Sequence, residues 1–259
     1  MDHLRAQARR SPLFVWFAKH GAIWPVIGLL AIWQLTCLAG FVPARLLPSP
    51  TAVALRLAHD LLDPGFLFHI GQTLIRLFSG FLIALALGLC LGIAMAQGAE
   101  PFLTPLVRVA SPIPKIALYP ALVLLLGFGH ASKIALVVAD AVFPLMLATL
   151  HGLRSVPPKL VWAAQAAGAS RSVVVLTVKL PSALGPILTG CRIALVIACL
   201  NVFLAEMISS SDGLGHLLVT AARSYQMVDM FVPLVLISLI GLLLNASLQF
   251  ARRRLPIAS

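Results

Sequence analysis

The sequence contains few charged residues, and acidic residues are the scarcest of them. Only 8 of its 259 residues are Asp or Glu, 10% are charged, and 60% are hydrophobic. Because soluble domains are about 45–50% apolar and about 25% charged, this composition excludes a water-soluble globule, a disordered chain and a fibrous repeat. The 19 Lys and Arg residues lie between long apolar runs. This placement argues against nucleic-acid binding and predicts an integral membrane protein in contact with the lipid bilayer.

Motifs for nucleotide, metal and nucleophile chemistry are also missing from the sequence. There is no Gly-x-x-x-x-Gly-Lys-Ser/Thr loop to hold ATP, and Gly127-Phe-Gly129 and Gly213-Leu-Gly215 are too short for dinucleotide fingerprints. His-Glu-x-x-His, Gly-x-Ser-x-Gly and Cys-x-x-Cys are absent too. We therefore expect a chain that is not an enzyme and that binds no cofactor or metal itself.

Long uncharged stretches predict six transmembrane helices. A helix needs about 20 apolar residues to cross the hydrocarbon core, and residues 20–44, 77–99 and 230–251 contain no Asp, Glu, Lys or Arg. The middle of the chain is similarly apolar, although several prolines blur the helix ends there. The predicted fold is all-α and integral to the membrane, with spans at residues 21–41, 70–97, 103–127, 133–152, 183–208 and 229–250.

The distribution of basic residues predicts the orientation of these spans. Cytoplasmic segments are enriched in Lys and Arg, and 13 of the 19 basic residues lie at the two chain ends and in residues 98–115 and 153–182. We therefore expect a basic cytoplasmic N-terminus at residues 1–20, a basic cytoplasmic tail at residues 251–259, and both termini inside. The first apolar run lacks an Ala-x-Ala-like exit, so we interpret it as a retained anchor.

Ionisable residues in or beside the spans are candidates for a translocation pathway. A charge that faces lipid near the bilayer centre costs at least about 2.5–3.5 kcal/mol, so such side chains should face a cavity, the bundle interior or one another. For Arg76, near the outer start of the second span, snorkelling to the interface is as good an explanation as function. A structural ion pair and a transport role both stay open for the others. The candidates are Arg76, Asp140, Arg192 and Glu206.

Small residues recur at every fourth position of the second span. In lipid, helices associate through close backbone approach, which a small-x-x-x-small face permits. This stripe is therefore expected to pack against another span. Its members are Gly80, Ala84, Gly88, Gly92 and Ala96.

Residues 153–182 predict two short helices joined at a glycine, which we call the elbow. Pro157 and Pro158 suit a helix start, and Gly168 suits a helix end. The intervening residues span roughly 15 Å, which is too short to cross a bilayer. A second short helix is expected from an N-cap at Ser170 to a point before Pro181. The elbow is either an amphipathic helix lying on lipid or a knob that docks into a partner protein.

The elbow resembles the EAA loop of ABC-importer permeases, whose pattern is Glu-Ala-Ala, three residues, Gly, nine residues, Ile-x-Leu-Pro. Here Trp162 stands in place of the Glu, and the rest reads Ala163-Ala164, three residues, Gly168, nine residues, Val178-Lys179-Leu180-Pro181. Further matches are similar to the nitrate/sulfonate/taurine/bicarbonate branch of these permeases. They are Thr73-Leu-x-Arg76-x-x-x-Gly80-Phe81, Pro112-x-Pro114, Leu118-x-Pro120, Gly127-Phe-Gly129-x-x-Ser132-Lys133, Thr189-Gly-x-Arg192-Ile-Ala and Ala205-Glu206-(six)-Gly213-Leu-Gly215.

The resemblance implies a type I importer permease of the bacterial inner membrane, with a first transmembrane helix and a five-helix core at residues 70–250. The implied partners are a second permease copy, an ATP-binding cassette ATPase dimer that carries ATP and Mg²⁺, and a periplasmic or surface-anchored solute-binding protein. The implied solute is a sulfonate, taurine, nitrate or a bicarbonate-like anion. The residues implied in coupling to the ATPase are Trp162, Ala163, Ala164, Gly168, Ala169, Leu180 and Pro181.

Two other classes of function stay open. An ion-coupled secondary transporter would use Asp140 or Glu206 as a proton or sodium site. Such transporters often contain inverted repeats with discontinuous helices in both halves, but the sequence shows no convincing internal repeat. A non-transporting membrane scaffold would instead recruit a soluble partner through residues 153–182.

Overall fold

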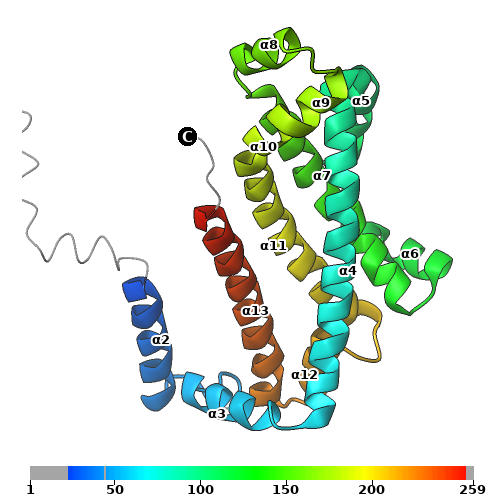
Figure 1. The fold of residues 1–259 in the computed structure, drawn as a ribbon. Coiled ribbons are helices and arrows are strands. Elements are labelled where there is room, and N and C mark those ends of the chain that lie inside the picture. The colour runs from blue at the N-terminus through cyan, green and yellow to red at the C-terminus, as the bar shows by residue number, and fades with distance from the viewer. Residues whose placement is uncertain (1–22, 44, 255–259) are drawn as a thin grey trace, which may run out of the picture.

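The computed structural model describes residues 23–43 and 45–254 of the 259-residue chain. These residues form helices and turns, with no β-strand among them. Long helices stand roughly along one direction, and shorter ones lie at both ends (Figure 1). In chain order the elements are α2 (Ile23–Leu38), α3 (Pro50–Asp60), α4 (Pro64–Ala94), η3 (Met95–Ala99), α5 (Glu100–Ala110), η4 (Lys115–Leu118), α6 (Tyr119–Leu126), α7 (His130–Arg154), α8 (Pro158–Ala166), α9 (Arg171–Val174), η5 (Val175–Lys179), α10 (Leu180–Ser182), α11 (Leu184–Ser209), α12 (Leu214–Arg223) and α13 (Met227–Arg254).

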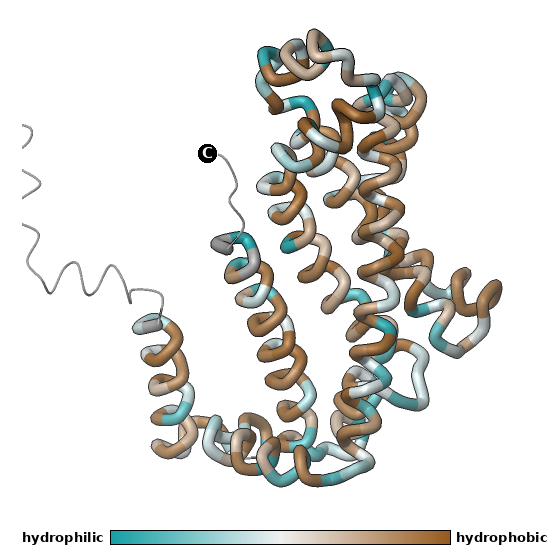
Figure 2. The backbone as a smooth tube through the Cα atoms, viewed as in Figure 1, coloured by the Kyte–Doolittle hydropathy of each residue, from teal (hydrophilic) through white to brown (hydrophobic). Residues whose placement is uncertain are grey.

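The core lies where α7 packs between α4 and α11. Leu77, Val137, Leu145, Ala194 and Val202 are completely buried there. Figure 2 shows mainly apolar residues along the long helices and more polar residues around the short helices at the two ends. This pattern suits helices whose backbone groups are satisfied internally while apolar side chains face hydrocarbon.

Four helical stretches in the described part of the chain are long and apolar enough to cross a membrane: Pro64–Ala110, His130–Arg154, Leu184–Ser209 and Met227–Phe250. They contain the spans expected at residues 70–97, 133–152 and 229–250, and all but the first residue of the span expected at 183–208. Of the first expected span, residues 23–38 form the shorter apolar helix α2, while residues 21 and 22 lie outside the described residues. The total of six spans therefore stays a prediction.

The span expected at residues 103–127 is not a single helix. α5 ends at Ala110, a turn follows, and the chain becomes helical again in η4 and α6. Pro112 and Pro114 explain the interruption, because proline lacks an N–H and disfavours helical backbone in the residue before it. α6 projects sideways from the bundle (Figure 1).

Two amphipathic helices, α3 and α12, lie between the expected spans, in segments where the sequence predicted no helix. Ser49 caps α3 by accepting a hydrogen bond from the Ala52 N–H at 3.3 Å, and Pro50 occupies its first turn. Asp63 caps α4 in the same way, accepting from the N–H groups of Gly65 and Phe66 at 3.2 Å each. The Ser-Pro pair before α3 and the Asp-Pro pair before α4 are the local signals at which these two helices begin.

The sequence predicted that the second helix of the elbow ends before Pro181, but the helix continues through this residue. α9, η5 and α10 form one helical run from Arg171 to Ser182, and Pro181 lies in the first turn of α10. The preceding residues form a π-helical turn, which is a wider turn than that of an α-helix. A proline inside a helical run lacks the N–H for the regular hydrogen bond, and its ring clashes with the carbonyl four residues earlier, so the π-helical turn just before Pro181 marks where the regular pattern is interrupted. The run then leads through Ala183 directly into α11.

Candidate functional site

The elbow lies at one end of the bundle, where α7 ends and α11 begins, opposite to α3 and α12 (Figure 1). α8 covers nine residues and begins at Pro158, after the extended residue Pro157. None of its residues is buried. Most of the surface of α8 is therefore accessible to solvent, lipid or another molecule.

Gly168 forms the turn of the elbow. Its φ is +87°, a left-handed conformation that favours glycine. The Gly168 N–H donates to the Gln165 carbonyl at 2.9 Å, and the Ala169 N–H donates to the Ala164 carbonyl at 3.0 Å. These two bonds are those of a Schellman motif, which satisfies the last carbonyls of a helix. Ser170 then caps α9 by accepting a hydrogen bond from the Val173 N–H.

The residues implied in coupling lie on the surface of the elbow. Trp162 is 64% exposed, Ala163, Gly168 and Pro181 are also exposed, and the remaining three are half-buried. An added Cβ at Gly168 would meet no atom within 4 Å. Gly168 is therefore required for its backbone conformation and not for the space around it. The half-buried residues are Ala164, Ala169 and Leu180.

Arg76 is the centre of a buried ionic cluster near the opposite end of the bundle. Its side chain is 2% exposed and that of Glu206 is 0% exposed, and Arg76 Nη1 donates to Glu206 Oε1 at 2.7 Å. Arg76 Nη2 also pairs with Asp212, and Arg76 Nε donates to His130 Nδ1 at 3.3 Å. The Arg76 cluster thus joins α4, the first turn of α7, α11 and the segment before α12. Arg76 does not snorkel to the interface.

Two further groups donate hydrogen bonds to the Glu206 carboxylate. The Thr73 hydroxyl donates to Glu206 Oε2 at 2.9 Å, and the Gly215 N–H donates to the same oxygen at 3.0 Å. Gly213 has a φ of +97°, and a Cβ there would lie 2.3 Å from Glu206 Cδ. Only glycine fits beside this carboxylate. The arrangement holds the start of α12 against α4 and α11.

Asp140 belongs to a second, smaller polar group inside the bundle. Asp140 Oδ2 accepts a hydrogen bond from Asn201 Nδ2 at 2.8 Å, and Lys115 Nζ lies 3.9 Å from Asp140 Oδ1. Lys115 also donates to the carbonyls of Ala110 and Ser111 at 2.9 and 2.8 Å. It therefore caps the end of α5 as well as approaching Asp140, consistent with the preference for cations at helix C-termini.

Arg192 does not join the other three candidate charges. It is exposed, and within the described part of the chain it forms no ion pair. Together with Thr189, Gln249 and Arg252 it lines a small recess between α11 and α13, on the half of α11 that faces the elbow. The structure therefore brings only two of the four candidates together, Arg76 and Glu206. Asp140 belongs to a separate polar group, and Arg192 lies apart from both.

The glycine stripe of α4 lies against α7. An added Cβ at Gly80 would lie 2.6 Å from Val137 Cγ1, and one at Gly88 would lie 2.5 Å from Leu145 Cβ. At Gly92 the nearest atom would be Thr149 Cβ, also at 2.5 Å. Ala84 is completely buried between them, and Ala96 continues the stripe as a half-buried residue of η3. These small residues let the two helix backbones approach closely.

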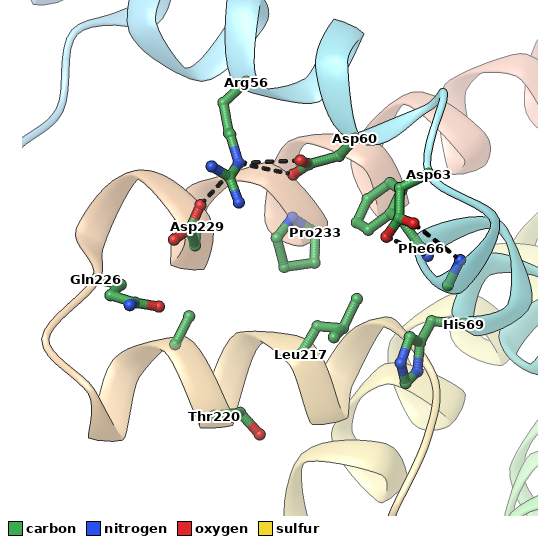
Figure 3. Close-up of a pocket in the computed structure, with 12 residues that line it drawn as sticks. Arg56, Asp60, Asp63, Phe66, His69, Leu217, Thr220, Gln226, Asp229 and Pro233 are labelled. Atoms are coloured by element: carbon green, nitrogen blue, oxygen red, sulfur yellow. Dashed lines mark hydrogen bonds and ion pairs between the residues drawn. The ribbon is translucent and has the colours of Figure 1, made fainter.

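A polar pocket of about 330 Å³ lies at the end of the molecule remote from the elbow. It is bounded by α3 and by the first turns of α4 and α13, with α12 opposite (Figure 3). Arg56 Nε lies 2.9 Å from Asp60 Oδ1 and 3.0 Å from Asp229 Oδ1. This bridge ties α3 to the start of α13.

Sequence reasoning missed several partners in these clusters. Asp212 and His130 were not among the candidate residues, and neither were Asn201 and Lys115. A further buried cation is Lys133, whose Nζ donates to the carbonyls of Phe128 and Gly129. The available signal was the presence of a cation inside an apolar run, which requires a buried partner even when the sequence does not say which.

Comparison with known proteins identifies the family and the fold of this chain. Residues 84–256 match the family model described as "Binding-protein-dependent transport system inner membrane component". The aliphatic sulfonates transport permease protein SsuC of Bacillus subtilis is 31% identical over 237 residues, covering 91% of this chain and 86% of that protein. The SsuC protein of Escherichia coli is 32% identical and covers 94% and 93%. The taurine transport permease TauC of Escherichia coli is 31% identical and covers 88% and 85%.

A solved structure shares the fold. A chain of the MetNI methionine ABC transporter, in an inward-facing conformation, matches with a TM-score of 0.60 and 24% sequence identity, covering 71% of this chain and 90% of that chain. The protein is thus an ABC importer permease, a multi-pass inner-membrane protein and not itself an enzyme. It belongs to the binding-protein-dependent transport system inner membrane component family, and it is similar to permeases named for aliphatic sulfonate and taurine transport. Membership implies a partner ATPase and a solute-binding protein.

Proposed function

We propose that this chain forms half of the pathway of an ATP-driven importer for a small sulfonate, with taurine or an aliphatic sulfonate as its solute. The observation that carries the proposal is the elbow, an exposed helix with a turn fixed at Gly168 and no role in the core. The relatives named for aliphatic sulfonate and taurine transport support the choice of solute. A second copy of the chain completes the pathway, and a solute-binding protein delivers the solute.

The connections of the elbow suit a mechanical role. α8 follows α7 after three residues, and on its other side the helical run 171–182 leads into α11. α7 and α11 are two of the three helices that form the core, together with α4. A displacement of α8 by an ATPase that binds it would therefore move both core helices together. In this proposal ATP and Mg²⁺ stay on the ATPase, each elbow sits in a groove of that subunit, and the elbow and both chain termini are cytoplasmic.

Transport in this proposal proceeds by alternating access. ATP closes the ATPase dimer, the two elbows follow it, and the pathway changes from inward to outward facing. A ligand shifts such an equilibrium only by its differential affinity for the two states. ATP and the loaded solute-binding protein would both favour the outward-facing state, which couples hydrolysis to delivery.

The two carboxylates suggested for an ion-coupled transporter are already engaged. Glu206 accepts hydrogen bonds from Thr73, Arg76 and Gly215, and Asp140 accepts one from Asn201. A proton or sodium site requires a carboxylate that exchanges partners during transport. The partners seen here favour structural roles, which supports an external energy source.

The test is purification of the tagged chain from native membranes in mild detergent, with identification of co-purifying proteins and an assay of ATPase activity. We expect an ATPase to co-purify with the wild type and with Gly168→Asn, because Asn tolerates left-handed backbone. Gly168→Val should insert in the membrane but lose most of the associated ATPase and ATP-driven uptake, because a β-branched residue is strained at a φ of +87°.

The outcomes separate the candidate functions. Undiminished uptake by Gly168→Val would show that the elbow does not couple the chain to an ATPase. A chain that purifies alone in several mild detergents, and that takes up solute on an ion gradient, would establish a secondary transporter. Competition of taurine and alkylsulfonates against nitrate and bicarbonate, in proteoliposomes that contain the whole importer, would test the proposed solute.

A further inference from the structure

A polar recess of about 270 Å³ lies beneath the elbow, between α8 and the bundle. Three segments distant in the sequence contribute to it. Gln97 of η3 forms one wall, Gln165 of α8 forms another, and Arg171 and Lys179 come from the helical run after Gly168. None of these polar side chains is among the implied coupling residues of the elbow.

The recess has an excess of positive charge. Neither Arg171 nor Lys179 forms an ion pair within the part of the chain that the structure describes, and none of the described residues lining the recess carries a carboxylate. The contrast with Arg154 is direct, because that nearby cation pairs with Glu100. Lys179 is half-buried, so water screens its charge only in part.

The donors in the recess match one ligand chemistry. Arg and Lys supply charge-assisted hydrogen bonds to oxyanions, and such bonds are about twice as strong as neutral ones. The amides of Gln97 and Gln165 add neutral donors from the two other walls. A sulfate, sulfonate or phosphate group presents several acceptor oxygens in a tetrahedral arrangement, and the recess is large enough to hold it together with water.

We propose that this recess binds a tetrahedral oxyanion, and that an occupied recess slows ATP hydrolysis by the assembled importer. A bound anion would connect α8, η3 and the run 171–182, and so restrain the elbow that the ATPase must move. The effect on hydrolysis rests on the proposed ATPase coupling, whereas binding of the anion does not. An importer of sulfonates would thereby respond to oxyanions that accumulate on the side of the elbow.

The binding test uses the full-length chain in nanodiscs and radiolabelled sulfate at constant ionic strength. We expect saturable binding at one site per chain, with Lys179→Gln and Arg171→Gln each raising the Kd about tenfold, because each removes one charge-assisted hydrogen bond. Lys179→Arg should keep the site. Lys159→Gln is the matched control, because Lys159 lies on α8 outside the recess and is exposed.

The source of the oxyanion is tested by lipid composition. An equal Kd in neutral and in phosphatidylglycerol-containing nanodiscs would assign the site to a free anion, whereas weaker sulfate binding in the anionic lipid would assign it to a headgroup phosphate. Absence of saturable binding, or a Kd that neither Gln variant changes, would overturn the site.

The second measurement is ATP hydrolysis by the assembled complex as sulfate is added. We expect turnover by the wild type and by Lys179→Arg to fall several-fold more than turnover by Lys179→Gln, since any direct effect of sulfate on the ATPase is common to all three. Equal inhibition of the three would overturn the regulatory part of the proposal. The binding experiment contains no ATPase, so its result stands apart from the proposed coupling.

Discussion

At the scale of single residues, the buried charges of this protein are organised as clusters with shared partners. Arg76 contacts two carboxylates, and Glu206 also accepts hydrogen bonds from a hydroxyl and a backbone N–H. Isolated ions in a low-dielectric interior are strongly unfavourable, and the cost is offset only when geometry and additional hydrogen bonds satisfy the group. The Arg76 cluster meets both conditions.

We predict that Arg76→Gln destabilises the protein severely. The substitution leaves Glu206 buried without its cation, and breaking a buried pair in this way typically costs about 3–5 kcal/mol. Arg56→Gln is the matched control, because the Arg56 side chain is 48% exposed in its bridge to Asp60 and Asp229, and exposed pairs contribute about 0–1 kcal/mol. Thermal unfolding in detergent, followed by intrinsic fluorescence, measures both. Equal losses of stability would show that burial adds nothing to the Arg76 cluster.

At the scale of elements, the contact between α4 and α7 depends on the absence of side chains. Gly80, Gly88 and Gly92 face α7 with no room for a Cβ, and Gly190 of α11 contacts α7 in the same way, since its Cβ would lie 2.4 Å from Ala148 Cβ. α7 is thus held closely from both sides through glycines on its neighbours. Because helices in lipid associate mainly by van der Waals packing, the closeness of the backbones determines the strength of the contact.

We predict that Gly88→Ala lowers stability by about 1–3 kcal/mol, the usual cost of forcing an extra group into a packed core. The same helix offers a matched control in Gly71, where an added Cβ would meet nothing within 4 Å. Gly71→Ala should be neutral or slightly stabilising, since alanine has the higher helix propensity. Thermal unfolding of the two variants compares them directly. A neutral Gly88→Ala would mean that α4 and α7 lie farther apart in the membrane than in this structure.

At the scale of the whole molecule, the structure has two different ends. The elbow is at one end, while α3, α12 and the polar pocket are at the other, and α4, α7, α11 and α13 connect them (Figures 1 and 3). Among the described residues, four cations lie within the elbow (Arg154, Lys159, Arg171 and Lys179), whereas α3 and α12 carry one arginine each. The bias of basic residues toward the cytoplasm then predicts which end faces which side.

We predict that single cysteines at the two ends react with a membrane-impermeant maleimide from opposite sides. In a background without the four native cysteines, Lys159→Cys on α8 should react only from the cytoplasmic side. Leu62→Cys should react from outside, because Leu62 is 82% exposed in the turn between α3 and α4. Intact cells and inverted membrane vesicles supply the two sides. Labelling of both positions from one side would refute the topology.

The sequence determined those features that depend on local chemistry. Apolar runs of sufficient length, each with no more than two charged residues, predicted α4, α7, α11 and α13, since hydrocarbon selects for length and composition. The first helix of the elbow was equally readable, because Pro158 starts a helix and Gly168 ends one whatever surrounds them. The break at Pro112 and Pro114 was readable in principle, but the apolar residues on both sides favoured a continuous span.

The tertiary structure alone decided which residues meet. Arg76 and Glu206 are 130 positions apart, and nothing in their local sequence distinguishes this pair from one between Arg192 and Asp140. Which charges form a pair depends on how α4 and α11 pack on α7. That packing depends on the fit between side chains of all three helices, which are distant in the sequence. The recess beneath the elbow has the same origin, because it exists only when η3, α8 and the run after Gly168 are brought together.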